Sequence, residues 1–411
     1  MKQGGRSGRA GVLVGLFALA VATPSCGGAG APELDEDDVM TSEGALTPDA
    51  HVSMLFVSDV HFGADGPMDA ATAGGDADDA EEELDEREDA KVANLTVVQK
   101  NAAFVSAIER LSSAAWAKPL AAVHVSNAFD GLVVTGDVTD DGQPAQWRAF
   151  LEGYEDRLKP LGIPVYETAG NHDYPFSYKK PEPGRPSDYP VISRIVARNT
   201  PAQRPGLVAE NGGGSYAFAV DDVLFVNLGV KPSNDRDSFA KHADRFRPSN
   251  PFHSLRFLER TLAEHGKRKK HVVLSFHYPI VAGDERVTRE ERTALYEAIR
   301  GYPVRAIVHG HRHRSDVYSW CGVPVFEVDT PRLMRPGRDS SMVALDVGKR
   351  WLSARTVAVR KDSPSSEVQV GLDPAACKPS KDTSRCWAYR EKVSSIRVRS
   401  GCDVGEVTKL P

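Results

Sequence analysis

Short apolar runs alternate along the chain with longer segments in which apolar residues recur every three or four positions. The short runs predict buried strands, and the recurring spacing predicts amphipathic helices. Strands are expected at residues 54–58, 132–135, 164–168, 271–276 and 305–308, with helices between them at 94–111, 143–158, 252–265 and 289–300. Strands that alternate with helices indicate an α/β fold.

Further apolar runs predict antiparallel strands. Asp221 and Asp222 separate two strand-like runs, 216–220 and 223–227, which is the pattern of a β-hairpin. Three later runs are expected to close the fold as antiparallel strands, at 323–328, 342–346 and 352–359. The whole set predicts a mixed sheet or two packed sheets, with helices outside.

Residues 1–26 have the pattern of an export signal. A basic start precedes an apolar run of 13 residues, 10–22, which is too short to span a bilayer and is typical of a signal peptide. Cys26 follows Ser25 and precedes Gly27, as at the cleavage site of bacterial lipoproteins, although Thr23 stands where that site prefers leucine. We therefore expect a periplasmic or cell-surface protein with a lipid anchor at Cys26, or else an ordinary signal peptide cleaved nearby.

The acidic residues are concentrated in two polar segments. The formal net charge is −6, yet residues 33–38 contain five acidic residues and residues 76–89 contain ten. Such stretches cannot bury enough apolar surface to fold. We interpret residues 27–50 as a flexible acidic tether and residues 65–92 as an acidic insert in a domain of residues 51–359. We interpret the insert as a solvated loop, because the spacing of its acidic residues is not that of an EF-hand calcium site.

Four cysteines besides Cys26 form an even set, which favours disulfides in an exported protein. They allow three pairings. Cys377 with Cys386 would close the shortest loop, and Cys321 with Cys402 would tie the tail, residues 360–411, to the core. The chain has no Cys-x-x-Cys spacing, so a thiolate zinc site is not expected.

Polar residues suited to binding metal ions follow five of the predicted strands. Strands that end at one edge of a sheet bring such residues together. Imidazole, carboxylate and amide ligands in this mixture suit Mn, Fe, Zn or Co. The segments are Asp59-Val60-His61, Gly136-Asp137, Gly170-Asn171-His172-Asp173, His277 and Gly310-His311-Arg312-His313.

In this order the five segments resemble the motifs of the calcineurin-like metallophosphoesterase superfamily, over residues 51–359. The resemblance implies a four-layer α/β/β/α sandwich with a dinuclear metal site at the sheet edge. Two divalent ions about 3.5–4 Å apart can share a hydroxide that attacks phosphorus. Carried over by position, one ion would be held by Asp59, His61, Asp137 and His313, and the other by Asp137, Asn171, His277 and His311.

The resemblance also assigns residues that touch the substrate. It implies that His172 steadies the transition state or protonates the leaving oxygen, and that Asp140 is the carboxylate that orients His172. Asp140 could equally be a turn residue beside Asp141-Gly142. We interpret His309 as a core residue or as a neighbour of the ligands, and Asp173 as a support for its loop.

Departures from the family patterns narrow the expected function. Purple acid phosphatases have tyrosine where Asp140 stands, and protein serine/threonine phosphatases have arginine where Asp141 stands. The pattern is closest to the branch of cyclic-nucleotide and general phosphodiesterases. We expect a small phosphoester substrate, monoester or diester. The alternatives are a non-catalytic lipoprotein that binds a phosphate-bearing ligand, and a nuclease. The basic run 267–270 is short and lacks aromatic neighbours, so no specific nucleic-acid partner is expected.

Overall fold

The computed structural model describes a large part of the unit Leu46–Pro411. The described residues are 50–63, 96–111, 129–174, 189–233, 253–281, 284, 286–334, 339–361, 368–371 and 388–410. The expected signal peptide, the lipid anchor at Cys26, the tether apart from Ala50, the acidic insert and the pair Cys377 and Cys386 lie outside them. Within these ranges no helix is both long enough and apolar enough to cross a bilayer.

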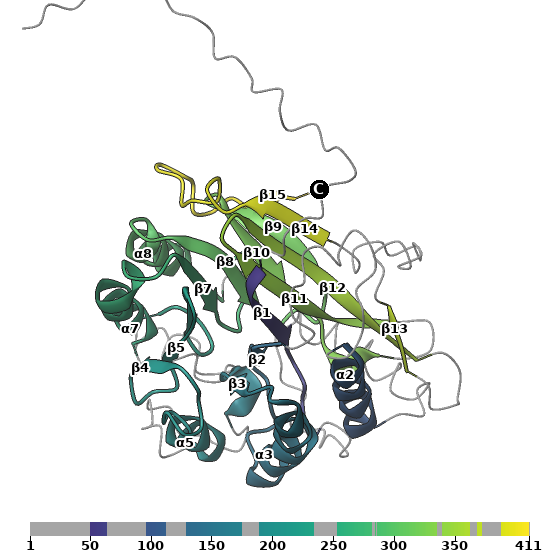
Figure 1. Ribbon diagram of the computed structural model, residues 1–411. Coiled ribbons are helices and arrows are strands. Elements are labelled where there is room, and N and C mark those ends of the chain that lie inside the picture. Colours follow the sequence, from purple (N-terminus) through teal and green to yellow (C-terminus); the bar gives the residue numbers. More distant parts are fainter. Residues whose placement is uncertain are drawn as a thin grey trace, which may run out of the picture. The chain divides into compact units, whose positions relative to one another are not determined.

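Two mixed β-sheets form the centre of this unit (Figure 1). The first has the order β13-β12-β11-β1-β2-β3, with β14 also paired to β12, and the second has the order β15-β9-β10-β8-β7-β6-β5-β4. The first sheet comprises β1 (Ala50–Val57), β2 (Gly131–Val134), β3 (Val165–Glu167), β11 (Ser340–Gly348), β12 (Trp351–Lys361), β13 (Val368–Gly371) and β14 (Ala388–Lys392). The second comprises β4 (Leu207–Glu210), β5 (Tyr216–Val220), β6 (Val223–Asn227), β7 (His271–Ser275), β8 (Val304–His309), β9 (Asp316–Trp320), β10 (Val323–Glu327) and β15 (Thr408–Lys409).

The sheets pack face to face because alternate residues of each strand point to opposite sides. Phe56 of β1 lies in a buried cluster with Phe218 and Phe225 of the second sheet. Leu55 faces the other way and lies in a cluster with Phe104, which belongs to a helix. The result is the four-layer α/β/β/α sandwich that the motifs imply.

The helices form the outer layers. In Figure 1 α2 and α3 lie beside the first sheet, and α7 and α8 lie beside the second. They are α2 (Val97–Leu111), α3 (Pro144–Phe150), α4 (Asp156–Leu158), α5 (Pro190–Ala197), α7 (Ser254–Thr261) and α8 (Arg289–Ile299). The helix expected at 143–158 is not one regular helix, because a π-helical turn, Leu151–Glu155, separates α3 from α4. Gly153 lies in that turn, where a Cβ would come 2.8 Å from the Phe62 ring.

The antiparallel strands are largely where the pattern places them. The hairpin at Asp221 and Asp222 is confirmed, since Val220 pairs with Val223. The strand expected at 323–328 is only partly antiparallel. It is β10, which pairs antiparallel with β9 but parallel with β8 on its other side. The short strand β9 was not expected, and it turns the chain back after the last ligand segment.

The C-terminal segment joins both sheets. Cys321 and Cys402 form a disulfide, which confirms the pairing that ties the tail to the core. Strand β14 adds to the first sheet and β15 to the second. Near the disulfide, Trp320 donates a hydrogen bond from Nε1 to the carbonyl oxygen of Val404 at 3.1 Å. The tail is therefore part of the sandwich.

Candidate metal centre

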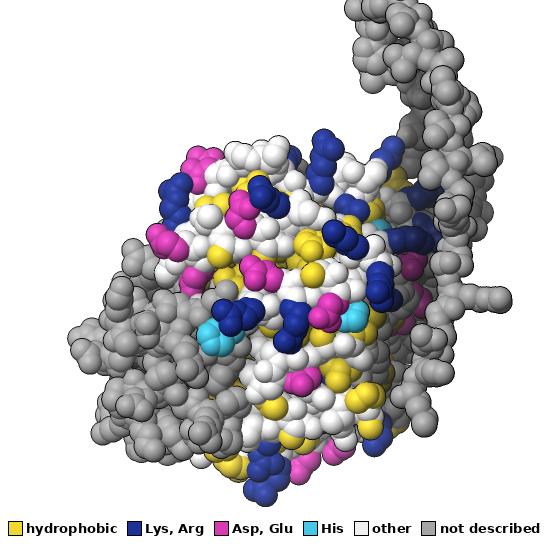
Figure 2. Space-filling model, turned by 90° about the vertical axis from the view of Figure 1, so that its left-hand side faces the viewer, with side chains coloured by type: hydrophobic (Ala, Val, Ile, Leu, Met, Phe, Trp, Pro, Cys, Tyr) yellow, Lys and Arg dark blue, Asp and Glu magenta, His cyan; other side chains and the backbone are white. Residues whose placement is uncertain are grey.

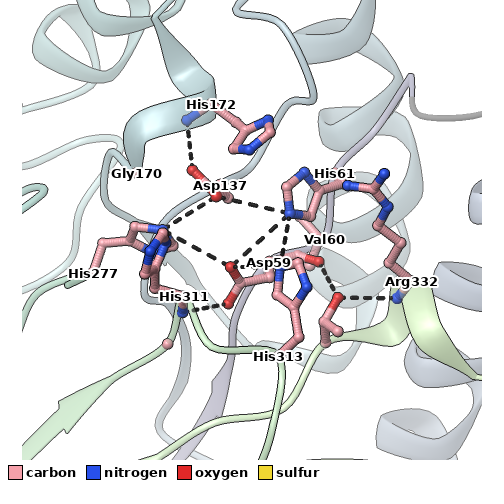
Figure 3. Close-up of polar contacts among 12 residues, drawn as sticks. Asp59, Val60, His61, Asp137, Gly170, His172, His277, His311, His313 and Arg332 are labelled. Carbon is pink, nitrogen blue, oxygen red and sulfur yellow. Dashed lines mark hydrogen bonds and ion pairs between the residues drawn. The ribbon is translucent and has the colours of Figure 1, made fainter. Parts of the chain in front are cut away.

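The candidate ligands lie where strands of both sheets end (Figure 3). Asp59, Asp137 and Asn171 follow the parallel strands β1, β2 and β3 of the first sheet. His277 and the His311–His313 segment follow the parallel strands β7 and β8 of the second sheet. Because the two sheets pack face to face, these ends meet at one edge of the sandwich.

The ligand-bearing loops have an unusual backbone. Five candidate ligands have positive φ angles, a conformation that is costly for residues with a Cβ and that clusters at functional sites. The angles are 52° at Asp59, 45° at His61, 49° at Asp137, 79° at His311 and 50° at His313. Neighbouring loops hold this backbone in place, since the amide of Asp59 donates to the Gly136 carbonyl at 3.1 Å. The turns aim the side chains inward.

Two glycines of the motifs leave room for ligand carboxylates. A Cβ on Gly170 would lie 2.1 Å from Oδ1 of Asp137, and a Cβ on Gly310 would lie 2.5 Å from Oδ2 of Asp59. Neither distance is possible between real atoms. These positions therefore require glycine because the backbone passes directly over a ligand.

One group of ligand atoms is formed by Asp59, His61 and His313. The Oδ1 atom of Asp59 lies 3.3 Å from Nε2 of His313 and 4.0 Å from Nε2 of His61. The two imidazole Nε2 atoms are 3.3 Å apart. Three donors converging on one point are suited to a transition metal.

The second group contains Asp137, His277 and His311, with Asn171 beside them. Nε2 of His277 lies 3.1 Å from Oδ2 of Asp137 and 3.0 Å from Oδ1 of Asn171. Its Nδ1 donates to the carbonyl oxygen of Thr135 at 3.1 Å, so Nε2 is the nitrogen that could bind a metal ion in place of its proton.

Asp137 connects the two groups. The same Oδ2 atom that lies 3.1 Å from His277 lies 3.7 Å from Nε2 of His61 in the first group. Its other oxygen, Oδ1, accepts a 2.7 Å hydrogen bond from the backbone amide of His172. The structure thus places Asp137 where a bridging carboxylate would stand.

The electrostatics of the pocket favour a cation. Burial alone would lower the pKa of His277, yet the neighbouring Asp137 and Asp59 raise it to about 9. Burial holds the pKa of His311 well below its ordinary value, so this imidazole is neutral. Among the described residues its buried Nε2 has no hydrogen-bond partner. A buried lone pair beside two carboxylates fits a pair of divalent metal ions.

His172 is partly exposed, whereas His277 and Asp137 are buried. The Nδ1 atom of His172 lies 2.8 Å from the carbonyl oxygen of Asp140, while the Asp140 carboxylate is 3.8 Å away. That carboxylate is closer to Nδ1 of His61, at 3.4 Å. Asp140 therefore contacts His172 mainly through its backbone carbonyl, whereas the expectation was a contact through its carboxylate, which lies nearer to His61.

Two further residues lie around the ligands without facing them. Asp173 accepts hydrogen bonds from the amides of Gly170 and Thr139, at 2.8 and 2.9 Å, and so joins two ligand loops. His309 contacts the hydroxyl of Tyr318 at 2.6 Å, and burial lowers its pKa to about 3. Neither is in a candidate ligand group among the described residues.

Residues other than the candidate ligands also hold the loops. Arg312, between the last two ligands, makes a bidentate ion pair with the buried Glu327, with Nε 2.6 Å from Oε1. Thr330 donates from its hydroxyl to the carbonyl of Asp59 at 2.6 Å and accepts the amide of Arg332 at 3.1 Å. Thr330 and Arg332 follow the predicted strand 323–328, so the rule that found the ligands could have indicated them.

Comparison with known proteins finds two curated relatives and solved structures that resemble this chain. A cAMP/cGMP dual specificity phosphodiesterase of Mycobacterium tuberculosis is 26% identical over 200 residues, 48% of this chain and 52% of that protein. A "probable cyclic nucleotide phosphodiesterase" of Psychrobacter sp. is 24% identical over 245 residues, 55% of this chain and 60% of that protein. The matches thus span about half of each curated relative. A dimetal phosphatase from Danio rerio has a TM-score of 0.48 at 14% identity, covering 78% of this chain and 99% of that one.

The family model of the calcineurin-like phosphoesterases matches residues 52–315. This range includes all seven candidate ligands and His172. The chain belongs to the calcineurin-like phosphoesterase family.

Proposed function

We propose that this protein hydrolyses small phosphoesters with two divalent metal ions, and that a phosphodiester, a cyclic nucleotide in the first instance, is its substrate. The observation that carries the proposal is the pair of ligand groups that share Asp137 beneath the partly exposed His172. The names of the two curated relatives support the choice of a cyclic nucleotide.

The donor sets divide between the two ions as follows. One ion would be held by Asp59, His61 and His313. The other ion would be held by Asn171, His277 and His311, and Asp137 would bind both ions. Such ions supply Lewis acidity and an activated water for attack on phosphorus. The two buried carboxylates offset the repulsion between the cations.

His172 would move the proton in this proposal. Because a carbonyl oxygen only accepts, the 2.8 Å contact with Asp140 makes Nδ1 the donor. Nε2 is then the nitrogen that exchanges a proton with the leaving oxygen. General acid catalysis of this kind contributes about 10²–10⁴-fold to the rate.

The charge on one described face supports a small substrate over a nucleic acid. Figure 2 shows Lys and Arg side chains interspersed with Asp and Glu on the face that carries α7 and α8. Within the basic run, Lys270 is paired with Asp222 at 2.7 Å. A nuclease would gain most from a continuous basic track.

An Asp137→Asn variant tests the proposal. We expect it to lose turnover of bis(p-nitrophenyl) phosphate and to bind less metal, because the shared carboxylate is removed. Asp222→Asn, on the exposed hairpin turn, is the matched control and should behave like the wild type. Parallel assays with p-nitrophenyl phosphate and cyclic nucleotides separate monoesterase from diesterase activity. Full activity in Asp137→Asn would exclude the proposed mechanism, and bound metal without turnover in the wild type would favour a non-catalytic binding protein.

We further propose that the protein is exported and anchored through a lipid on Cys26. The basic start, the apolar run 10–22 and the small residues around Cys26 support this. Radiolabelled palmitate should be incorporated into the wild type and not into Cys26→Ser. Equal labelling of both would contradict the anchor.

A further inference from the structure

Histidine and arginine alternate over residues 311–314, the last ligand segment. The ring of His311 lies beside that of His277, with centroids 5.0 Å apart (Figure 3). The Nε2 atom of His313 lies 3.3 Å from Nε2 of His61. The two histidines therefore belong to different ligand groups. One short segment supplies an imidazole to each group.

The two arginines of this segment share one buried carboxylate. Arg312 donates from Nε to Oε1 of Glu327 at 2.6 Å, and from Nη2 to Oε2. Arg314 donates from Nε to Oε2 at 3.4 Å. Glu327 is fully buried, whereas Arg312 and Arg314 are 17% and 49% exposed. The alternation thus separates two histidines in the ligand groups from two arginines that contact Glu327.

Paired strands hold Glu327 beside the segment. Strand β10 runs parallel to β8, and Glu327 at its end pairs with His309 at the end of β8. The amide of Val328 donates to the carbonyl of His309 at 2.8 Å, and the amide of Gly310 donates to that of His277 at 3.1 Å. The carboxylate is therefore a fixed point next to the chain that leads into the ligands.

The backbone on both sides of Arg312 is in a costly conformation. The φ angles of His311 and His313 are 79° and 50°, a region that residues with a Cβ rarely adopt unless their surroundings hold them there. A bidentate pair with a carboxylate fixes the plane of a guanidinium as well as its position. Because Arg312 stands between the two histidines, its pair with Glu327 opposes the relaxation of both.

The segment also connects the two ligand groups through its backbone. The amide of His311 donates to Oδ2 of Asp59 at 3.0 Å, and Asp59 belongs to the group that contains His313. The imidazole of His311 belongs to the other group, with Asp137. A displacement of residues 311–313 would therefore move donors of both groups.

We propose that Arg312 and Glu327 are positioning residues, and that their ion pair directs His311 to one metal ion and His313 to the other. The inference deepens the proposed function, because it takes the two ligand groups to hold two ions. Glu327 is in no candidate ligand group among the described residues, so it acts through the segment that Arg312 belongs to. It also lies beyond residues 52–315, the range that the family model matches.

Manganese binding tests the proposal separately from turnover. Calorimetry gives the dissociation constants and the number of ions bound, and the EPR spectrum shows whether two bound ions are spin-coupled through a shared ligand. We expect Arg312→Met to weaken the binding of both ions by about 10- to 100-fold, the loss typical of residues that orient metal ligands. Arg312→Lys should recover part of the affinity, because lysine keeps the charge but not the planar fork.

The matched control is another bidentate arginine pair. Arg157 of α4 donates from Nε to Oε1 of Glu109 in α2 at 3.2 Å and from Nη2 to Oε2 at 2.8 Å. Neither residue belongs to a ligand loop. Arg157→Met should therefore bind manganese like the wild type.

The double variant Arg312→Met/Glu327→Met separates positioning from stability. Replacing a buried ion pair by apolar side chains of similar size is often neutral or stabilising. We expect this variant to unfold at the denaturant midpoint of the wild type or above it. It should nevertheless bind manganese as weakly as Arg312→Met and, at saturating manganese, give the EPR spectrum of uncoupled ions. If the methionine variants do not fold, Arg312→Lys decides by the same measurements.

Three outcomes are decisive. Binding of both ions within twofold of the wild type in the double variant would overturn the inference, since the pair would then only stabilise the fold. Weakened binding of one ion alone in Arg312→Met would also overturn it, because the segment carries a ligand of each ion. A wild type that binds two coupled ions but turns over no ester would refute the proposed function and leave this inference standing.

Discussion

Replacing Gly170 with alanine tests how closely the ligand loops are packed. The added Cβ would lie 2.1 Å from Oδ1 of Asp137 and 2.3 Å from its backbone nitrogen. Both contacts must open to about 3.4 Å or more, so the two loops must move apart by about 1 Å. The φ angle of Gly170 is −106°, which alanine also adopts, so the substitution acts through this contact alone.

The expected cost has two parts. Overpacking of this kind destabilises a protein by about 1–3 kcal/mol. A displacement of about 1 Å at the shared carboxylate should reduce turnover by about 10²-fold. Gly301 is the control, because its φ is not positive and a Cβ there meets nothing within 4 Å.

The assays are metal content by mass spectrometry, thermal unfolding and turnover of bis(p-nitrophenyl) phosphate. Gly170→Ala should bind less metal and turn over more slowly, and Gly301→Ala should match the wild type. Gly170→Ala with wild-type metal content and turnover within twofold of normal would refute the close approach of this backbone to Asp137.

Three other predictions concern stability. Serine at both Cys321 and Cys402, which are 81 positions apart, should lower the free energy of unfolding by up to about 4–5 kcal/mol in denaturant titrations, and no change would contradict a structural disulfide. Glu327→Gln removes one charge of a buried ion pair and should cost about 3–5 kcal/mol and weaken metal binding, whereas the exposed Glu297→Gln should cost under about 0.5 kcal/mol. Burial lowers the pKa of His309 from 6.5 to about 3. Between these values the unfolded chain binds a proton that the folded chain does not, so the free energy of unfolding decreases as the pH is lowered. Between pH 6.5 and 5 metal-free protein should lose about 2 kcal/mol through this residue, and His309→Gln should lack that loss; identical pH profiles of the two would contradict it.

The strands and the positions of the candidate ligand segments were predictable from the sequence for one reason. Each segment follows a buried apolar run, and runs of this kind end at a common sheet edge. Asp59, Asp137 and His277 could therefore be placed before any coordinates were known. The hairpin at Asp221 and Asp222 was equally predictable, because its turn separates two strand-like runs.

Other features leave no local signal. The contact between Asp140 and His172 runs through a backbone carbonyl, which every residue has. Glu327 interrupts the apolar pattern of β10 only at its end, and its partner Arg312 is 15 residues away. Strand β9 is short and only partly buried, and helix α5 has eight residues, too few for a clear periodic pattern. These elements are fixed by tertiary contacts.

Anomalous diffraction from crystals of the manganese-loaded protein tests the central claim most directly. The account predicts two metal peaks about 3.5–4 Å apart, with an Asp137 oxygen between them. His61 and His313 should bind one ion, and His277 and His311 the other. A single peak, or two peaks that do not share Asp137, would contradict it.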